Sequence, residues 1–334
     1  MRRIAAALVL PGVLIAAAYG AVGTLVYDQG TFALPHCEQG PRPVWANNQP
    51  AAYVTGGAFG IQNVDITPYE MPIYETVTFS SRSDSITLQA WDVPAPLDVG
   101  DAAPAVILVH GLNDCRRAPA ILLPAGMLHR AGFHVLLLDL RNHGDSQITT
   151  GRMSGGLFEY LDVLGAWDWL VNAQGIPPER IGLFGVSLGA ATTLIAAGEE
   201  PRIAAVWEDS SYADVQLAIA DQLTYRGIPT FLAPAGVLMG RLLDGVDLSA
   251  RSPLAAIAIW GNRPLFITHG EADTRIPVLH AYRLAEAMRA NGITIEPWII
   301  PGSPHVQGMF DATDEYETRL VDFFRASLGT GTNP

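Results

Sequence analysis

From residue 73 onward, short apolar runs of strand-forming residues alternate with longer stretches that have helical spacing. The runs 105–109 and 135–138 are apolar throughout, as strands are when helices cover both faces of a parallel sheet. Between them, residues 118–130 show apolar residues at helical spacing, and Gly132 follows as a stop signal. This alternation predicts an α/β fold with a doubly wound, mostly parallel sheet.

The expected strands are short and rich in aliphatic and β-branched residues: 73–80, 86–93, 105–109, 135–138, 181–185, 203–207, 265–268 and 293–300. The first two alternate apolar with polar residues, as an antiparallel pair does. The expected helices are 118–130, 158–173, 188–197, 278–290 and 315–327. Residues 209–262 interrupt the alternation with several prolines and helical pieces, and such a length predicts an inserted helical lid.

The N-terminus carries an uncharged run of 24 residues between Arg3 and Asp28. As a helix it would extend roughly 36 Å, enough to cross a hydrocarbon core of about 30 Å. Arg2 and Arg3 precede it, so the positive-inside rule places the rest of the chain outside the cytoplasm. Residues 1–29 are therefore expected to be a transmembrane anchor or a signal peptide.

The alternative of a cleaved signal peptide would use a small-residue site at 16–18 or 18–20 and would release a secreted enzyme. The retained anchor is favoured, because the apolar run is longer than most signal-peptide cores. Residues 30–72 are rich in Pro, Gly, Asn and Gln and are expected to form a linker. The hydrolytic domain is then expected to span 73–330.

Composition limits the chemistry and the partners. Hydrophobic residues make up 49% of the chain, which supports a large buried core, and the net charge of −13 opposes binding to nucleic acid. Only two cysteines are present, Cys37 and Cys115, and no metal-binding or phosphate-binding motif occurs. We therefore expect no metal and no cofactor. After export the two cysteines would meet an oxidising compartment, where they could pair.

The strongest local motif is Gly185-Val186-Ser187-Leu188-Gly189. It stands between a predicted strand and an Ala-rich predicted helix, where a sharp turn presents one hydroxyl at the edge of the sheet. The small residues two before and two after the serine let the strained backbone pass close to its neighbours. This context makes Ser187 the expected nucleophile.

A serine hydroxyl is a weak nucleophile, so it needs a base and an acid that orients the base. Two later loops follow strands and supply such groups, Asp273 at the end of the sequence HGEAD and His305 after the last strand. The order Ser, Asp, His is the one found in α/β-hydrolases. Asp209, which follows another strand, is the alternative acid. The other histidines are expected to be structural or surface residues.

The loop after strand 105–109 begins with His110-Gly111-Leu112. Such a loop commonly donates one N–H group to an oxyanion hole, and the residue after the nucleophile donates the other. Leu112 and Leu188 are therefore the expected donors. Arg116 and Arg117 follow this loop and could face the substrate, although a solvated pair is the favoured interpretation.

Taken together, these motifs resemble the α/β-hydrolase superfamily over residues 73–328. Within this superfamily, the chain is similar to the exported, membrane-anchored hydrolases of the serine-aminopeptidase-like and Bem46-like groups. Those proteins often have Arg-Gly-His-Gly where this chain has Asn142 in place of the first glycine. Prolyl-oligopeptidase-like members usually follow the elbow with a second glycine, whereas here Ala190 follows Gly189.

The expected activity is that of a serine hydrolase, with acyl transfer to water through Ser187, His305 and Asp273. The expected substrate is a small carboxylic ester or a lipid-derived acyl ester, because an anchored active site lies near lipids. A serine peptidase acting on short peptides is the alternative, and a non-catalytic binding protein on the same fold is a second one.

Overall fold

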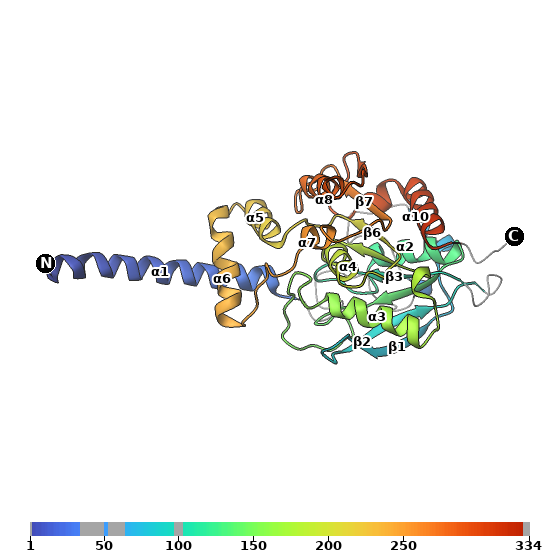
Figure 1. The fold of residues 1–334 in the computed structure, drawn as a ribbon, viewed down its shortest axis with the longest axis horizontal. Coiled ribbons are helices and arrows are strands. Elements are labelled where there is room, and N and C mark those ends of the chain that lie inside the picture. The colour runs from blue at the N-terminus through green and yellow to red at the C-terminus, as the bar shows by residue number, and fades with distance from the viewer. Residues whose placement is uncertain (1, 34–49, 53–63, 97–102, 330–334) are drawn as a thin grey trace.

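The computed structural model describes residues 2–33, 50–52, 64–96 and 103–329. Its centre is one eight-stranded sheet in the order β1-β2-β4-β3-β5-β6-β7-β8 (Figure 1). β1 and β2 run antiparallel to their neighbours, and the other pairs are parallel. The strands are β1 (Glu75–Ser80), β2 (Thr87–Val93), β3 (Ala105–Val109), β4 (His134–Leu138), β5 (Ile181–Val186), β6 (Ala205–Asp209), β7 (Leu265–Gly270) and β8 (Trp298–Ile300).

Helices cover both faces of this sheet. The helices α2 (Pro119–Arg130) and α10 (Thr313–Leu328) contribute to the core on one face. The helices α3 (Tyr160–Asn172), α4 (Leu188–Glu199) and α8 (Leu279–Ala290) contribute to the core on the other. Every residue of β3, β4 and β5 is buried, which is why these strands carry continuous apolar runs in the sequence. The predicted doubly wound α/β fold is confirmed.

Two details differ from the sequence-based expectations. β8 contains only the last three residues of the run 293–300, and Pro297 stands directly before it. Proline lacks the N–H group that a ladder requires, so it limits a strand at this position. A short helix, α9 (Gly308–Asp311), follows the loop that carries His305 and was not expected from the sequence.

The predicted lid is helical and lies between β6 and β7. It contains α5 (Val215–Tyr225), the short 3-10 helix η4 (Thr230–Leu232), α6 (Ala233–Leu243) and α7 (Pro253–Ile257). Asp214 caps α5 by accepting hydrogen bonds from the N–H groups of Gln216 and Leu217, and the Ser252 hydroxyl accepts one from the N–H of Ala255 in α7. In Figure 1, α5 and α6 lie on the side of the domain from which the N-terminal helix projects.

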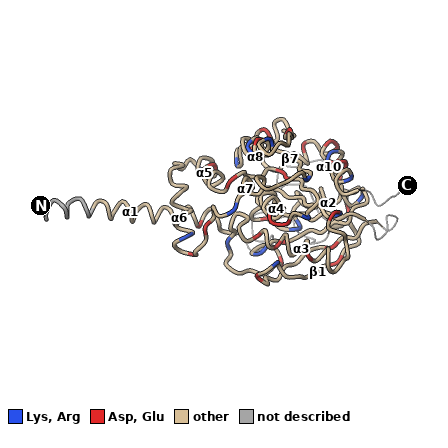
Figure 2. The backbone as a smooth tube through the Cα atoms, in the orientation of Figure 1, with Lys and Arg blue, Asp and Glu red and all other residues tan. Residues whose placement is uncertain are grey.

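The N-terminal apolar run forms one long helix, α1 (Arg2–Thr31), which has two parts. Residues 11–18 are exposed, project away from the domain and carry no charge (Figures 1 and 2). The C-terminal part packs against α6 and buries Val26 and Tyr27. By length and composition, Pro11–Thr31 could cross a membrane, although the docked end belongs to the folded domain.

The chain remains attached to the domain just after α1. The Ala33 N–H donates to Gly151 O at 3.0 Å, and the Met153 N–H donates to Thr31 O at 2.7 Å. The first residues of the predicted linker 30–72 are therefore bonded to the domain, directly after α1. Cys115 is buried and disulfide-bonded, while Cys37 lies outside the described residues.

Candidate active site

Ser187 stands at the turn between β5 and α4 with φ 54° and ψ −117°. A non-glycine residue in this region is strained by about 1–3 kcal/mol, which the surrounding structure must offset. The two flanking glycines make the turn possible. A Cβ atom on Gly185 would lie 2.5 Å from Gly189 O, and one on Gly189 would lie 2.1 Å from Val109 O. Residues with side chains cannot occupy either position without moving the backbone.

Three side chains from separate loops form a continuous hydrogen-bonded chain. The Nε2 atom of His305 lies 2.9 Å from Ser187 Oγ, and its Nδ1 atom lies 2.6 Å from Asp273 Oδ2. β5, β7 and β8 are parallel strands whose C-terminal ends meet at one edge of the sheet. The loops that follow them bring together the three residues that the sequence singled out.

Asp273 is held as an anion by its surroundings. Its Oδ1 atom accepts hydrogen bonds from the N–H groups of Arg275 and Ile276, each at 2.9 Å. Burial acts to raise the pKa of Asp273, but hydrogen bonds from His269 and His305, together with their charge, hold that pKa well below its usual range. The carboxylate is therefore fixed in position and in charge beside His305.

Asp209, the alternative acid, has other partners. Its Oδ1 atom accepts from the Ser210 hydroxyl and its Oδ2 atom from the Tyr316 hydroxyl, each at 2.8 Å. Burial raises the pKa of its carboxyl group. The backbone of Asp209 also contributes, since its carbonyl oxygen accepts the Ser187 N–H at 2.8 Å. The structure thus pairs His305 with Asp273, while Asp209 supports the elbow.

The two expected oxyanion donors lie beside the serine. Leu188 is the first residue of α4, where helix geometry leaves the N–H group without an intrahelical partner. A Cβ atom on Gly111 would lie 3.4 Å from Ser187 Cβ, so the loop carrying Leu112 passes next to Ser187. Leu112 and Leu188 line the same cavity as Ser187 and His305.

A second histidine, the buried His269, also contacts Asp273, and only its place in HGEAD marks it in the sequence. His269 Nε2 lies 3.2 Å from Asp273 Oδ2 and donates to Ile276 O at 2.7 Å. Glu208 is also buried, and burial raises its pKa to about 8. Glu208 Oε1 and His269 Nδ1 both lack a hydrogen-bond partner among the described residues.

The arginine pair after the oxyanion loop is neither solvated nor directed at the substrate cavity, so the favoured interpretation was wrong for Arg116. Its guanidinium is buried, forms ion pairs with Asp139 and Asp145, and stacks 5.0 Å from the Trp91 ring. Arg117 shares Asp145. The guanidinium of Arg116 can bond to both carboxylates at once because it is planar and carries several N–H donors.

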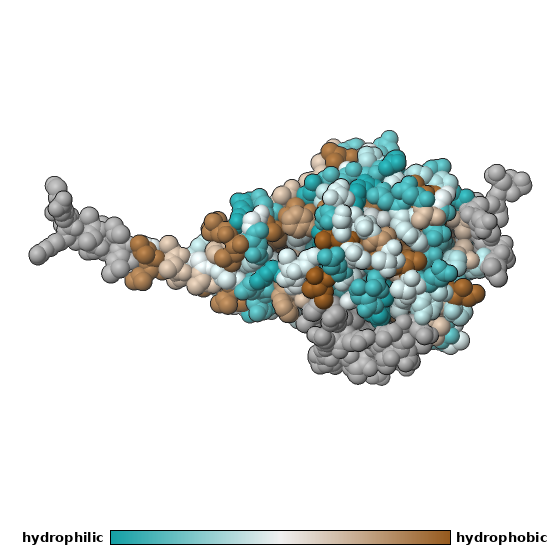
Figure 3. Space-filling view, turned by 90° about the horizontal axis from the view of Figure 1, so that it is seen from below, coloured by the Kyte–Doolittle hydropathy of each residue, from teal (hydrophilic) through white to brown (hydrophobic). Residues whose placement is uncertain are grey.

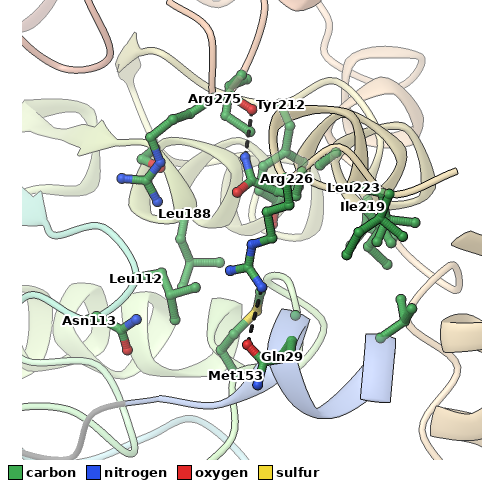
Figure 4. A pocket seen from close by; sticks show the side chains of 18 of the residues that line it. Gln29, Leu112, Asn113, Met153, Leu188, Tyr212, Ile219, Leu223, Arg226 and Arg275 are labelled. Atoms are coloured by element: carbon green, nitrogen blue, oxygen red, sulfur yellow. Dashed lines mark hydrogen bonds between the residues drawn. The ribbon is translucent and has the colours of Figure 1, made fainter. Parts of the chain in front are cut away.

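The cavity above Ser187 has a volume of about 290 Å³ and is mostly apolar (Figure 4). α5 contributes Val215, Ala218, Ile219 and Leu223, and α1 contributes Val22, Leu25, Val26 and Gln29. In Figure 4, Leu112 and Leu188 lie at one side, and Ile219 and Leu223 lie at the other. No group of three His, Cys, Asp or Glu side chains suited to a metal ion occurs among the described residues.

Residues 125–331 match the prolyl oligopeptidase family, which covers more than half of the chain. The chain belongs to this family. Members of the prolyl oligopeptidase family share the α/β-hydrolase fold that the sheet and the elbow display. Ala190 in place of the second elbow glycine therefore does not remove the chain from the family.

Individual proteins agree with this assignment. The chain is 28% identical over 258 residues to the uncharacterized protein YfhR of Escherichia coli, which covers 76% of this chain and 81% of YfhR. It superposes on an esterase of Pyrococcus furiosus with a TM-score of 0.61 at 21% identity, covering 80% and 98% of the two chains. It also superposes on the acylaminoacyl peptidase of Pyrococcus horikoshii, with a TM-score of 0.56 at 16% identity, covering 78% of this chain and 43% of the peptidase. Family and fold together make this protein an α/β-hydrolase.

The structure explains the departure at Asn142. This residue has φ 62°, a conformation that favours glycine and that asparagine tolerates. Its Oδ1 atom accepts hydrogen bonds from the backbone N–H groups of Thr149, Thr150 and Gly151. Asparagine therefore fits the glycine position and also organises the loop 149–152, against which the end of α1 docks.

Proposed function

We propose that this protein is a serine hydrolase that cleaves carboxylic esters or related acyl bonds through an acyl-enzyme. Ser187 is the nucleophile, His305 the general base and acid, and Asp273 the residue that orients the imidazole. The Leu112 and Leu188 N–H groups form the oxyanion hole. The observation that carries the proposal is the chain of hydrogen bonds from Ser187 Oγ through His305 to Asp273, beside an apolar cavity.

In the first step, Ser187 Oγ attacks the acyl carbonyl while its proton moves to His305 Nε2. The carbonyl electrons move to the oxygen, where the two N–H groups stabilise the negative charge. When the carbonyl re-forms, the bond to the leaving group breaks and His305 returns the proton to the departing alcohol. Water then repeats the sequence at the acyl-enzyme, and the products are a carboxylic acid and free Ser187.

A serine peptidase acting on short peptides is the second candidate. It is favoured by the family name and by the fold similarity to an acylaminoacyl peptidase. We favour the ester because most of the cavity lining is apolar and suits an acyl chain, while Gln29 of α1 and Gln222 of α5 are among its polar side chains. A role in binding alone would not explain why the backbone of Ser187 adopts a strained conformation.

We also propose that α1 anchors the enzyme in the cytoplasmic membrane with the hydrolytic domain on the extracytoplasmic side. Residues 11–18 of α1 are uncharged and exposed, as a membrane segment requires. The disulfide at Cys115 supports an oxidising compartment. Cleavage of α1 as a signal sequence would instead give a secreted enzyme.

Kinetics on paired substrates test the proposed reaction. Purified protein is assayed with p-nitrophenyl esters and with aminoacyl p-nitroanilides, in the wild type and in Ser187→Ala. We expect ester hydrolysis that exceeds amide hydrolysis and that disappears in Ser187→Ala. Faster hydrolysis of the anilides would establish the peptidase, and ester hydrolysis that survives in Ser187→Ala would refute the proposed nucleophile.

A further inference from the structure

The contact between α1 and the lid is a close helix–helix junction. Gly236 and Gly240 stand one turn apart on α6 and face α1. A Cβ atom on Gly236 would lie 2.6 Å from Val26, and one on Gly240 would lie 2.9 Å from the Tyr27 ring. Gly23 of α1 likewise approaches the α6 backbone, where its Cβ atom would lie 2.8 Å from Ala235 O. Small residues spaced four apart allow this close approach, as they do between membrane helices.

Polar contacts fix the same end of α1 to the domain. Arg152 pairs with Asp28 at 2.6 Å, bonds to the Thr31 hydroxyl at 3.1 Å and lies over the Tyr27 ring. The Tyr27 hydroxyl donates to Asp244 at 2.7 Å. Packing and ion pairing together hold this helix end in one position, so the side chains that it directs inward belong to the substrate cavity.

Three of the α1 side chains that line the cavity are apolar, and a fourth, Gln29, is polar. Val22, Leu25 and Val26 line the same cavity as Ser187. Val22 and Val26 pack in one hydrophobic cluster with Ile219 and Leu223 of α5, whereas Leu25 is exposed. Gln29 closes this wall by accepting a hydrogen bond from Arg226 at 3.1 Å (Figure 4). The helix that leads toward the membrane is therefore also a wall of the cavity above the nucleophile.

The outer surface around this junction also exposes several large apolar side chains. The lid exposes Phe231, Leu238, Leu242 and Leu243, and Figure 3 shows hydrophobic side chains gathered where α1 leaves the domain. In Figure 1, α6 runs across α1. A helix that lies across a membrane-spanning helix lies along the membrane surface, where exposed apolar side chains can enter the lipid. The exposed α1 residues Val13, Leu14 and Ile15 continue this surface away from the domain.

We propose that α1 is a substrate-binding element. The acyl chain of a membrane-resident ester enters the cavity from the bilayer and lies along the cluster of Val22, Val26, Ile219 and Leu223, which places its carbonyl at Ser187. This inference rests on the proposed serine hydrolase activity and adds the substrate class: esters with one long acyl chain, drawn from the lipid. Cleavage at either predicted signal position would leave Val22 and the rest of this cavity wall in the protein.

A matched pair of neighbouring substitutions tests the role of α1. Val22 faces the cavity, whereas Ala21 beside it is exposed and does not line the cavity. Full-length wild type, Val22→Phe and Ala21→Phe are assayed in phosphatidylcholine vesicles with p-nitrophenyl acetate and p-nitrophenyl dodecanoate. Labelling of Ser187 by a short fluorophosphonate verifies that each variant has an intact site.

We expect Val22→Phe to lower kcat/KM for the dodecanoate by about tenfold or more, roughly the effect of leaving two methylenes unburied, and to change the acetate by less than about twofold. Ala21→Phe should change neither substrate. An unchanged ratio of dodecanoate to acetate in Val22→Phe would overturn the proposal. So would an equal loss on both substrates, since α1 would then only support the fold.

A second measurement separates this inference from the catalytic assignment. Ser187→Ala in the same vesicles is irradiated with a long-chain ester that carries a diazirine in its acyl chain. Cross-links on α5 between residues 215 and 225 would support the acyl site even if the wild type hydrolysed no ester. Cross-links confined to residues 11–18 of α1 would overturn the acyl site even if Ser187 proved to be the nucleophile.

Discussion

Replacing Asp273 by asparagine removes one charge from the site and changes little else in shape. In the wild type, Oδ1 accepts two backbone N–H groups and Oδ2 faces His305 Nδ1 at 2.6 Å. An asparagine whose oxygen keeps the backbone bonds must direct its NH₂ group at His305. The imidazole can accept a hydrogen bond from this NH₂ group only at an unprotonated Nδ1. Its own proton then lies on Nε2, the atom that must receive the proton from Ser187.

The magnitude follows from this wrong tautomer. By analogy with other triads we expect a loss of about 10⁴ in kcat, which corresponds to about 5.5 kcal/mol in the barrier. His269 increases the effect, because its Nε2 atom lies 3.2 Å from Oδ2 and would also face the new NH₂ group. The folded structure should survive, since both backbone hydrogen bonds to Oδ1 are kept.

The assay is steady-state hydrolysis of a p-nitrophenyl ester, with thermal unfolding measured on the same samples. Asp209→Asn is the matched control, because Asp209 is equally buried but bonds to Ser210 and Tyr316 instead of His305. We expect it to cost far less in kcat. The reasoning would be refuted if Asp273→Asn stayed within tenfold of wild type, or if Asp209→Asn were the more damaging change in a folded protein.

Three further substitutions and one topology assay test other parts of the account. Gly189→Ala should abolish ester hydrolysis, because the new Cβ atom would lie 2.1 Å from Val109 O; normal activity would show that the elbow tolerates side chains. Asn142→Ala should lower the free energy of unfolding by about 1–3 kcal/mol in denaturant titrations, since it strains φ 62° and leaves three N–H groups without their acceptor; no loss would argue against this cap. Burial raises the pKa of Glu208 to about 8, well above the usual range of a glutamate, so the folded state keeps a proton that the unfolded chain releases, and stability should fall as pH rises from about 5 to 8. Glu208→Gln should flatten that fall in melting curves, and an unchanged pH profile would show that Glu208 is not its source. Protease added to intact cells or spheroplasts should digest the domain; full protection until lysis would place it in the cytoplasm.

Much of the sheet could be predicted because a strand that is buried on both faces has apolar residues at successive positions in the sequence. β3, β4 and β5 are continuous apolar runs, and the predicted limits agree with the structure to within one residue. The chemistry of the elbow is equally local, since Gly185 and Gly189 are required by contacts within a few residues of Ser187 or with the adjacent strand. Such features depend on local contacts that restrict which residue type can stand at a position.

Features that depend on contacts between distant segments were missed. The docking of α1 on α6 joins residues about two hundred positions apart, and the glycines that permit it, Gly236 and Gly240, look like ordinary helix residues in the sequence. Arg116 looked like a surface residue because its buried partner Asp139 lies on another loop. The contact between His269 at the end of β7 and Asp273 in the following loop depends on the rotamers of both side chains, which no sequence pattern specifies.

The nucleophile is the central claim, and covalent labelling tests it most directly. Full-length protein is treated with a fluorophosphonate, digested and mapped by mass spectrometry, beside Ser187→Ala as the control. The account predicts a single adduct on Ser187, none on Ser146 or Ser210, and none at all in the Ser187→Ala protein. An undiminished adduct in Ser187→Ala, or a wild type that is not modified, would contradict it.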